Sequence, residues 1–171
     1  MKILFASILS LAAIAPAWAA TGEKPKNPKP PMTLDVAQTV VKIPIAKKIS
    51  MDDAVEAMKL RANALNIKLV AELPLSKQIE AMGGKSRRIE IYQFCDAMTA
   101  KKMVENDIHF AAYLPCRIAL VEDAKGQAWL VMMNLDMFIQ SPKLDPALKQ
   151  DAIAVRDTLM QIMQAGSTGD W

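Results

Sequence analysis

Cys95 and Cys116 are the two cysteines of the 171-residue chain and its most reactive side chains. Two cysteines can form a disulfide, exchange thiols with a partner protein, or offer soft sulfur ligands to Cu(I). A redox-active pair usually has Cys-x-x-Cys spacing beside the start of a helix, and the spacing here is much longer. Asp96 can nevertheless begin a helix directly after Cys95, which would partly stabilise a thiolate there. Thiol exchange therefore stays open.

Metal-ligating side chains are few elsewhere in the sequence. His109 is the only histidine, and a lone histidine near a helix end is more often structural. With the two cysteines, Met98 and His109 make a weak candidate set for copper or for contact with haem. The four residues form no compact cluster in the sequence, so we expect no cofactor and keep copper or haem as the alternative. No side chain is predicted to be catalytic.

Residues 1–19 have the layout of a secretory signal peptide. Lys2 precedes an apolar run over residues 3–14, and Ala17 and Ala19 are the small residues before a predicted cut after Ala19. The run is shorter than the about 20 residues that a membrane-spanning helix needs. We therefore expect a soluble exported protein with no transmembrane segment in the mature chain. The short, lysine-led leader is typical of a bacterium, which predicts the periplasm.

Residues 20–36 are rich in proline and lysine, which predicts a disordered spacer. The rest of the chain has the size of one ordinary domain. A formal net charge of +3 and an aromatic content of 5% offer neither a basic face nor many stacking side chains. Nucleic acid is therefore not expected as a partner.

Two periodicities divide this domain into elements. Apolar residues at every second position predict strands, and apolar residues three and four apart predict helices. The strands are expected over residues 40–47, 67–73, 87–94, 116–123 and 127–134. The helices are expected over residues 51–65, 97–104 and 146–166, with one further helical turn over 77–82.

Local signals mark the ends of these elements. Pro44 lacks a backbone donor, which places the first strand at a sheet edge. Ser50 and Asp145 are expected as helix N-caps. Gly166 is expected to end the last helix, so that residues 167–171 form a flexible tail.

The element order is β-α-β-β-(α)-β-β-α. Short connections and a hairpin favour a mostly antiparallel sheet with helices on one face, which is an α+β domain over residues 37–166. In the third strand, Ile89 and Ile91 share one face of the sheet while Glu90 and Tyr92 take the other.

One stretch of the sequence is more specific than its periodicity. Its motifs are Phe94-Cys95-Asp96, Pro115-Cys116-Arg117 and Glu122-Asp123-x-x-Gly126. With them the chain resembles, over residues 40–134, the exported branch of the domain-of-unknown-function 302 family. The resemblance implies a small α+β fold similar to one TATA-binding-protein half, often paired as a homodimer, and no established reaction. The chain departs from the family pattern at Asp96-Ala97, where asparagine-proline is common, and at Met132-Met133.

The resemblance also implies that the third and fourth strands are antiparallel neighbours, which places both cysteines at one end of the sheet. Parallel strands would separate them by about 20 Å, beyond disulfide reach. Because an oxidising compartment favours the bond, we expect a disulfide between Cys95 and Cys116.

Two classes of function follow from these features. The preferred one is a non-enzymatic periplasmic binding or interaction module, expected as a homodimer that binds an unknown periplasmic protein or small ligand. The alternative is a periplasmic redox or metal-handling accessory protein, for copper or haem, that acts through Cys95 and Cys116.

Overall fold

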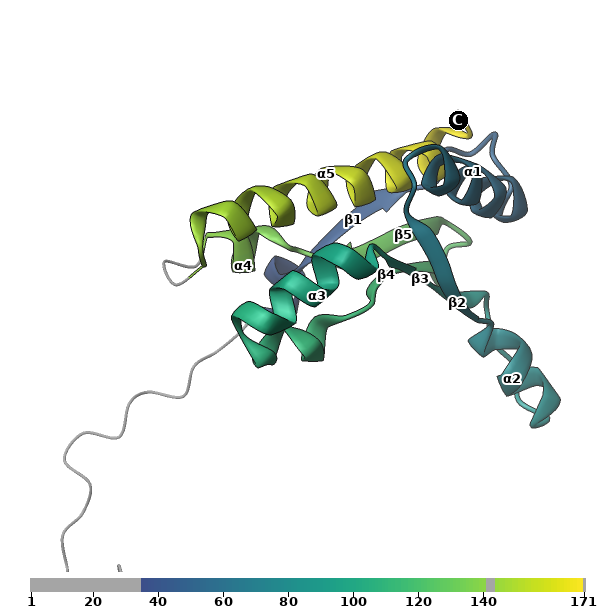
Figure 1. The fold of residues 1–171 in the computed structure, drawn as a ribbon. Coiled ribbons are helices and arrows are strands. Elements are labelled where there is room, and N and C mark those ends of the chain that lie inside the picture. Colours follow the sequence, from purple (N-terminus) through teal and green to yellow (C-terminus); the bar gives the residue numbers. More distant parts are fainter. Residues whose placement is uncertain (1–34, 141–143, 171) are drawn as a thin grey trace, which may run out of the picture. The chain divides into compact units, whose positions relative to one another are not determined.

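A five-stranded antiparallel sheet is the centre of the fold, with strand order β1-β5-β4-β3-β2 (Figure 1). The computed structural model describes residues 35–140 and 144–170. The predicted signal peptide and most of the predicted spacer therefore lie outside the described residues. The strands are β1 (Val40–Pro44), β2 (Lys68–Leu73), β3 (Ile89–Cys95), β4 (Cys116–Glu122) and β5 (Ala128–Met133).

Helices connect and follow these strands. The α-helices are α1 (Met51–Ala64), α2 (Leu75–Ala81), α3 (Ala97–Asn106), α4 (Asp136–Ile139) and α5 (Pro146–Thr168), and two 3-10 helices are η2 (Val36–Thr39) and η3 (Ile108–Tyr113). Among the helices of the described residues, none has the length and apolarity to cross a bilayer. The predicted α+β class, the single domain and the antiparallel sheet are confirmed.

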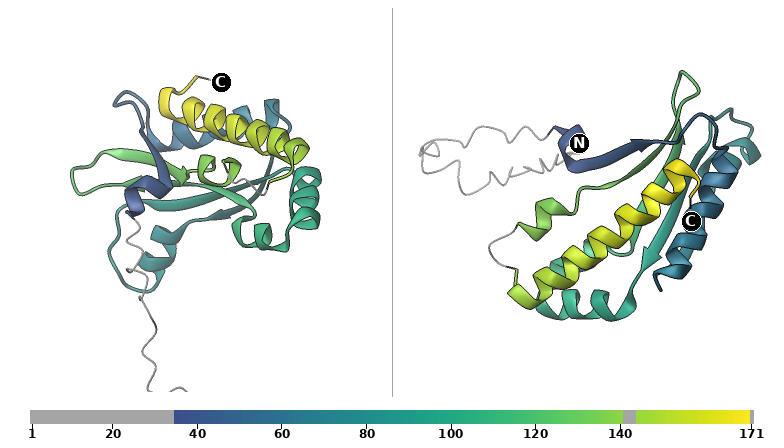
Figure 2. Two further views of the ribbon diagram at one scale, coloured as in Figure 1. Left: turned by 90° about the vertical axis from the view of Figure 1, so that its left-hand side faces the viewer. Right: turned by 90° about the horizontal axis from the view of Figure 1, so that it is seen from above.

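The core lies between one face of the sheet and helices α1 and α5 (Figures 1 and 2). Its largest fully buried side chains come from both layers. The sheet contributes Phe94, Ile118, Leu120 and Leu130, and the helices contribute Met58, Ile162 and Met163. Burying side chains of this size stabilises the fold by about 1.5–3 kcal/mol each before entropy is counted.

The opposite face of the sheet stays outside this core. Six half-buried side chains on it belong to neither core cluster of the described residues, and we call them the uncovered sheet face. They form two rows across neighbouring strands, Ile91–Ala119–Val131 and Ile89–Val121–Trp129.

Strand β3 shows how the two faces divide. Its burial alternates, with Glu90, Tyr92 and Phe94 beneath the helices and Ile89 and Ile91 on the uncovered sheet face. The predicted alternation is confirmed. The face covered by the helices is the one that carries a carboxylate, and the two isoleucines lie on the other face.

Several predicted element ends are also confirmed. The Ser50 hydroxyl accepts from the Asp53 N–H at 3.0 Å, and the Asp145 carboxylate accepts from the Ala147 N–H at 2.8 Å. Strand β1 is an edge strand, as Pro44 predicted, although it ends at Pro44 rather than at residue 47. The predicted helical turn is α2, and η2, η3 and α4 were not predicted.

The predicted end of the last helix is wrong. Gly166 is buried inside α5, and the helix continues to Thr168, with Gly169 as its left-handed C-cap at φ 78°. A Cβ on Gly166 would lie 2.6 Å from Met58 Cγ and 3.1 Å from the Ala54 carbonyl oxygen. The missing side chain therefore lets α5 approach α1 closely. Ser167 and Thr168 belong to the helix rather than to a tail, and Ser167 donates to the Pro44 carbonyl at 2.7 Å.

Gly166→Ala is expected to destabilise the domain. Alanine is favoured over glycine inside a helix by about 1 kcal/mol, but overpacking a close contact costs about 1–3 kcal/mol. We expect overpacking to win, and chemical denaturation measures the net loss. Gln164→Ala, at an exposed position of α5, is the control and is expected to change the unfolding free energy by less than about 0.5 kcal/mol. A stabilised Gly166→Ala protein would contradict the close packing of α1 against α5.

Candidate functional site

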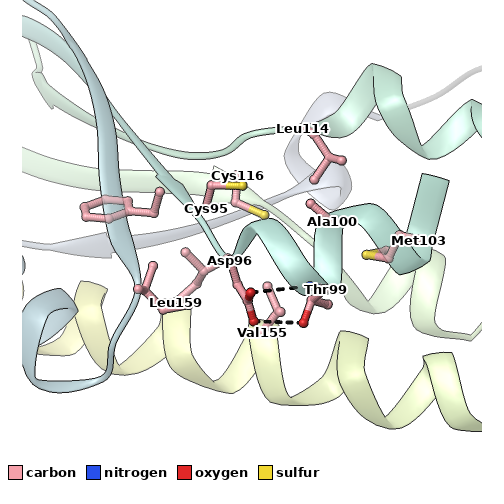
Figure 3. Close-up of a pocket in the computed structure, with 11 residues that line it drawn as sticks. Cys95, Asp96, Thr99, Ala100, Met103, Leu114, Cys116, Val155 and Leu159 are labelled. Atoms are coloured by element: carbon pink, nitrogen blue, oxygen red, sulfur yellow. Dashed lines mark hydrogen bonds between the residues drawn. The ribbon is translucent and has the colours of Figure 1, made fainter. Parts of the chain in front are cut away.

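The two cysteines lie together at one end of the sheet. Strands β3 and β4 are antiparallel neighbours, and Phe94 is directly opposite Cys116, so Cys95 is one position further along. Both cysteines are half-buried free thiols in this structure, and both line one small cavity of about 30 Å³ (Figure 3). The predicted placement of both cysteines at one end of the sheet is confirmed.

A helix cap brings α3 over the cysteines. Asp96 ends β3 and begins α3, because its carboxylate accepts from the Met98 N–H at 3.0 Å and from the Thr99 N–H at 3.3 Å. The Thr99 hydroxyl also donates to Asp96 at 2.8 Å (Figure 3). This hydroxyl bond is the main cause that holds the pKa of Asp96 below its ordinary value. Thr99, Ala100 and Met103 then form one wall of the cavity.

Apolar side chains surround this end of the sheet. The remaining wall of the cysteine cavity includes Phe94, Leu114, Val155 and Leu159. A second cavity of about 40 Å³ shares Cys116 with the first and is lined by Phe110, Tyr113, Phe138 and others. Each volume is close to the about 30 Å³ that one water molecule occupies in the liquid. Neither cavity has room for haem in this conformation.

The electrostatics of the cysteine pair oppose a reactive thiolate. Burial, with a smaller contribution from the neighbouring Cys95, raises the pKa of Cys116 to about 11. Burial also raises the pKa of Cys95, and the negative charge of Asp96 adds to the rise. The start of a helix would by itself favour a thiolate at Cys95. Asp96, which begins α3, opposes that thiolate with its negative charge. Redox-active cysteines have lowered pKa values.

The other metal candidates lie apart from the cysteines. Met98 is 68% exposed and lines none of the cavities that contain the cysteines. The His109 side chain is 88% exposed, and its Nδ1 lies 2.6 Å from an Asp107 carboxylate oxygen. Within residues 35–140 and 144–170, no group of three histidine, cysteine or carboxylate residues could hold a metal ion. The structure therefore brings together the two sulfurs but not the four candidates.

A buried polar network at the other end of β3 was missed by the sequence reasoning. Glu90 is 7% exposed, and one of its oxygens accepts from Arg88 Nη2 at 2.9 Å and from the Tyr92 hydroxyl. Arg88 Nη1 donates to Asp52 at 2.6 Å and so joins α1 to β3. The sequence did contain a signal for this network. Glu90 is a charged residue on the same face of its strand as the large side chains of Tyr92 and Phe94.

The network keeps its carboxylate ionised. Burial alone would raise the pKa of Glu90, but the hydrogen bonds from Arg88 and Tyr92 outweigh burial and hold the pKa below its ordinary value. Burial and the bond to Glu90 raise the pKa of Tyr92, so its hydroxyl remains a donor. At neutral pH the molecule therefore holds an ionised carboxylate beneath α1, at the end of β3 opposite the cysteines.

The family described as Domain of unknown function DUF302 matches residues 41–166. A crystal structure of an uncharacterized conserved protein DUF302 from Bacillus stearothermophilus is similar at 16% identity, with a TM-score of 0.62. The match covers 74% of this chain and 96% of that chain, and at this identity it supports the fold alone. No curated protein matches the chain.

The reduced cysteines are expected to react slowly. In a Cys95→Ser variant, iodoacetamide should alkylate Cys116 with a pH midpoint well above the ordinary thiol value of about 8.5, because burial is the largest cause of the raised Cys116 pKa and remains in the variant. At pH 8 the folded protein should react roughly a hundredfold more slowly than the same protein in denaturant, which is the control. A midpoint below the ordinary value would show an activated thiolate instead.

Proposed function

The chain belongs to the Domain of unknown function DUF302 family, and we propose that it is an exported binding or interaction module that does not act as an enzyme. The uncovered sheet face carries this proposal. Six apolar side chains lie in two rows on it, outside the core. Contiguous apolar surface of this kind is typical of an interaction site.

Export is proposed from the leader. Residues 1–19 have the charge, apolar run and small residues of a signal peptide. Cleavage after Ala19 would leave the proline- and lysine-rich segment before a domain whose first described element is η2. The proposed location is the periplasm, and the chain would then belong to an exported branch of its family.

Pairing of two copies is the proposed use of the uncovered sheet face. Two-fold pairing buries the same patch on both copies. Ala119 is the small central residue of one row, between Ile91 and Val131. At the rim, the Lys42 ammonium lies 3.6 Å from the centre of the Trp129 ring, so a charged group borders the apolar rows.

The second candidate function is a redox or metal-handling role that acts through Cys95 and Cys116. A structural disulfide is the better-supported proposal for this pair, because both cysteines lie at one end of neighbouring antiparallel strands. A disulfide between Cys95 and Cys116 would close a loop of about 20 residues and stabilise the fold by roughly 3 kcal/mol. The raised thiol pKa values support a structural bond over thiol exchange. A copper-handling role would rest on the two sulfurs alone, because Met98 and His109 line no cavity with them.

The pairing proposal predicts that a charge in the middle of the uncovered sheet face separates the copies. Ala119→Asp should convert a dimer to a monomer in sedimentation equilibrium, because two-fold pairing would bury two facing carboxylates without partners. Ala124→Asp, in the exposed hairpin turn, makes the same substitution off this face and should leave the dimer intact. A monomeric parent protein, or an Ala119→Asp protein that still dimerises, would refute the proposal.

The disulfide proposal is tested by intact mass after blocking free thiols without reductant. Protein taken from the periplasm should begin at Ala20, lack two hydrogen atoms and take up no blocking reagent. A Cys95→Ser, Cys116→Ser protein should unfold at lower denaturant concentration by roughly 3 kcal/mol. Two alkylated thiols in the unreduced periplasmic protein would show that no bond forms.

A further inference from the structure

A polar cleft lies beside the buried Glu90 network, at the far end of the sheet from the cysteines. Two adjoining cavities of about 280 and 350 Å³ share four lining residues, Asp52, Lys77, Arg88 and Glu90. The walls come from α1, α2, β2 and β3 and the residues around them. These volumes are near the lower end of the about 300–1,000 Å³ that small-molecule sites occupy. They are also far larger than the cavities at the cysteine end.

Glu90 offers one unused oxygen to this cleft. Its side chain is 9% exposed, and both of its hydrogen bonds, from Arg88 and Tyr92, go to the same oxygen, Oε2. The other oxygen, Oε1, accepts from no residue in the described part of the chain, and it is not among the fully enclosed unpartnered atoms. Because this oxygen is not enclosed, it can accept a hydrogen bond from a molecule in the cleft. A ligand with an N–H donor, above all an ammonium group, could donate the hydrogen bond that Oε1 lacks.

Lys77 offers the opposite charge. It lines both cavities and forms no ion pair with a described residue. The two other cations of the cleft are engaged, since Lys59 contacts Glu72 at 2.9 Å and Arg88 is held between Asp52 and Glu90. The charge of Lys77 reaches Glu90, because it contributes to the low pKa of that carboxyl. An available cation and an available carboxylate oxygen thus face one cleft.

We propose that this cleft binds a small zwitterion of the size of an amino acid or dipeptide. Its ammonium group would donate to Glu90 Oε1, and its carboxylate would meet Lys77. The lining contains four carboxylates, Asp52, Glu72, Glu80 and Glu90, and three cations, Lys59, Lys77 and Arg88. This balance disfavours a dianion such as phosphate, while a molecule with both charges matches both free groups.

The energetics of the network support a binding role. Buried ion pairs are weak contributors to stability, because the loss of hydration offsets the attraction, and apolar side chains of similar volume are often as stable. Groups held in this way beside a cavity are typical of functional sites. The proposal does not depend on pairing through the uncovered sheet face, because Glu90 and Tyr92 lie on the opposite face.

Isothermal titration calorimetry of the mature protein tests the proposal. The probes are the free L-amino acids and alanyl-alanine, and the tightest binder is then compared with its N-acetylated and amidated forms. We expect each blocked form to bind at least about tenfold more weakly, a loss of roughly 1.4 kcal/mol. If no probe binds, or if a blocked form binds as tightly as the zwitterion, the proposal is wrong.

Single substitutions test which residue binds each charged group of the ligand. Lys77→Ala, at an exposed position, should weaken binding of the zwitterion but not of the amidated form, which has no carboxylate for Lys77 to contact. Glu90→Gln keeps the shape of the side chain and should weaken the zwitterion and the amidated form alike. Lys85→Ala, exposed and outside both cavities, is the control and should bind as the parent does. Equal losses for Lys77→Ala and Lys85→Ala would place the ligand elsewhere.

Discussion

Antiparallel pairing between β3 and β4 places Phe94 opposite Cys116 at one end of the sheet and Glu90 opposite Leu120 towards the other. A shift by one residue would move every side chain of β3 to the other face, because side chains alternate along a strand. This register therefore places Glu90 on the face of the sheet that α1 covers. The antiparallel pairing places both cysteines at one end of the sheet, where they line one cavity.

The two helices that cover the sheet maintain this arrangement. Met58 of α1 and Ile162 of α5 are fully buried against the strands. Close approach of α5 requires the absence of a side chain at Gly166, where a Cβ would collide with Met58 and Leu130. The contact continues to Ser167, which bonds the backbone at Pro44, so the C-terminal turn of α5 is joined to strand β1.

Desolvation acts at both ends of β3 with opposite results. At the apolar end, burial raises the pKa values of Cys95 and Cys116 because no cation or donor compensates it sufficiently. At the polar end, Arg88 and Tyr92 donate to Glu90 and outweigh the same penalty, so that its pKa falls. The cysteine end of β3 therefore favours neutral thiols. The other end keeps the Glu90 carboxylate ionised.

The sequence by itself determined the local features of this protein. Ser50 and Asp145 were predicted as caps because their side chains bond the next N–H groups, and Pro44 marked an edge because it lacks a donor. The element order and the α+β class followed from periodicity and short connections. Only the tertiary structure decided which face of β3 is buried, why Gly166 lies inside a helix, and that Met98 and His109 stand apart from the cysteines. Periodicity defines two faces of a strand, but the docking of helices distant in sequence selects the covered one.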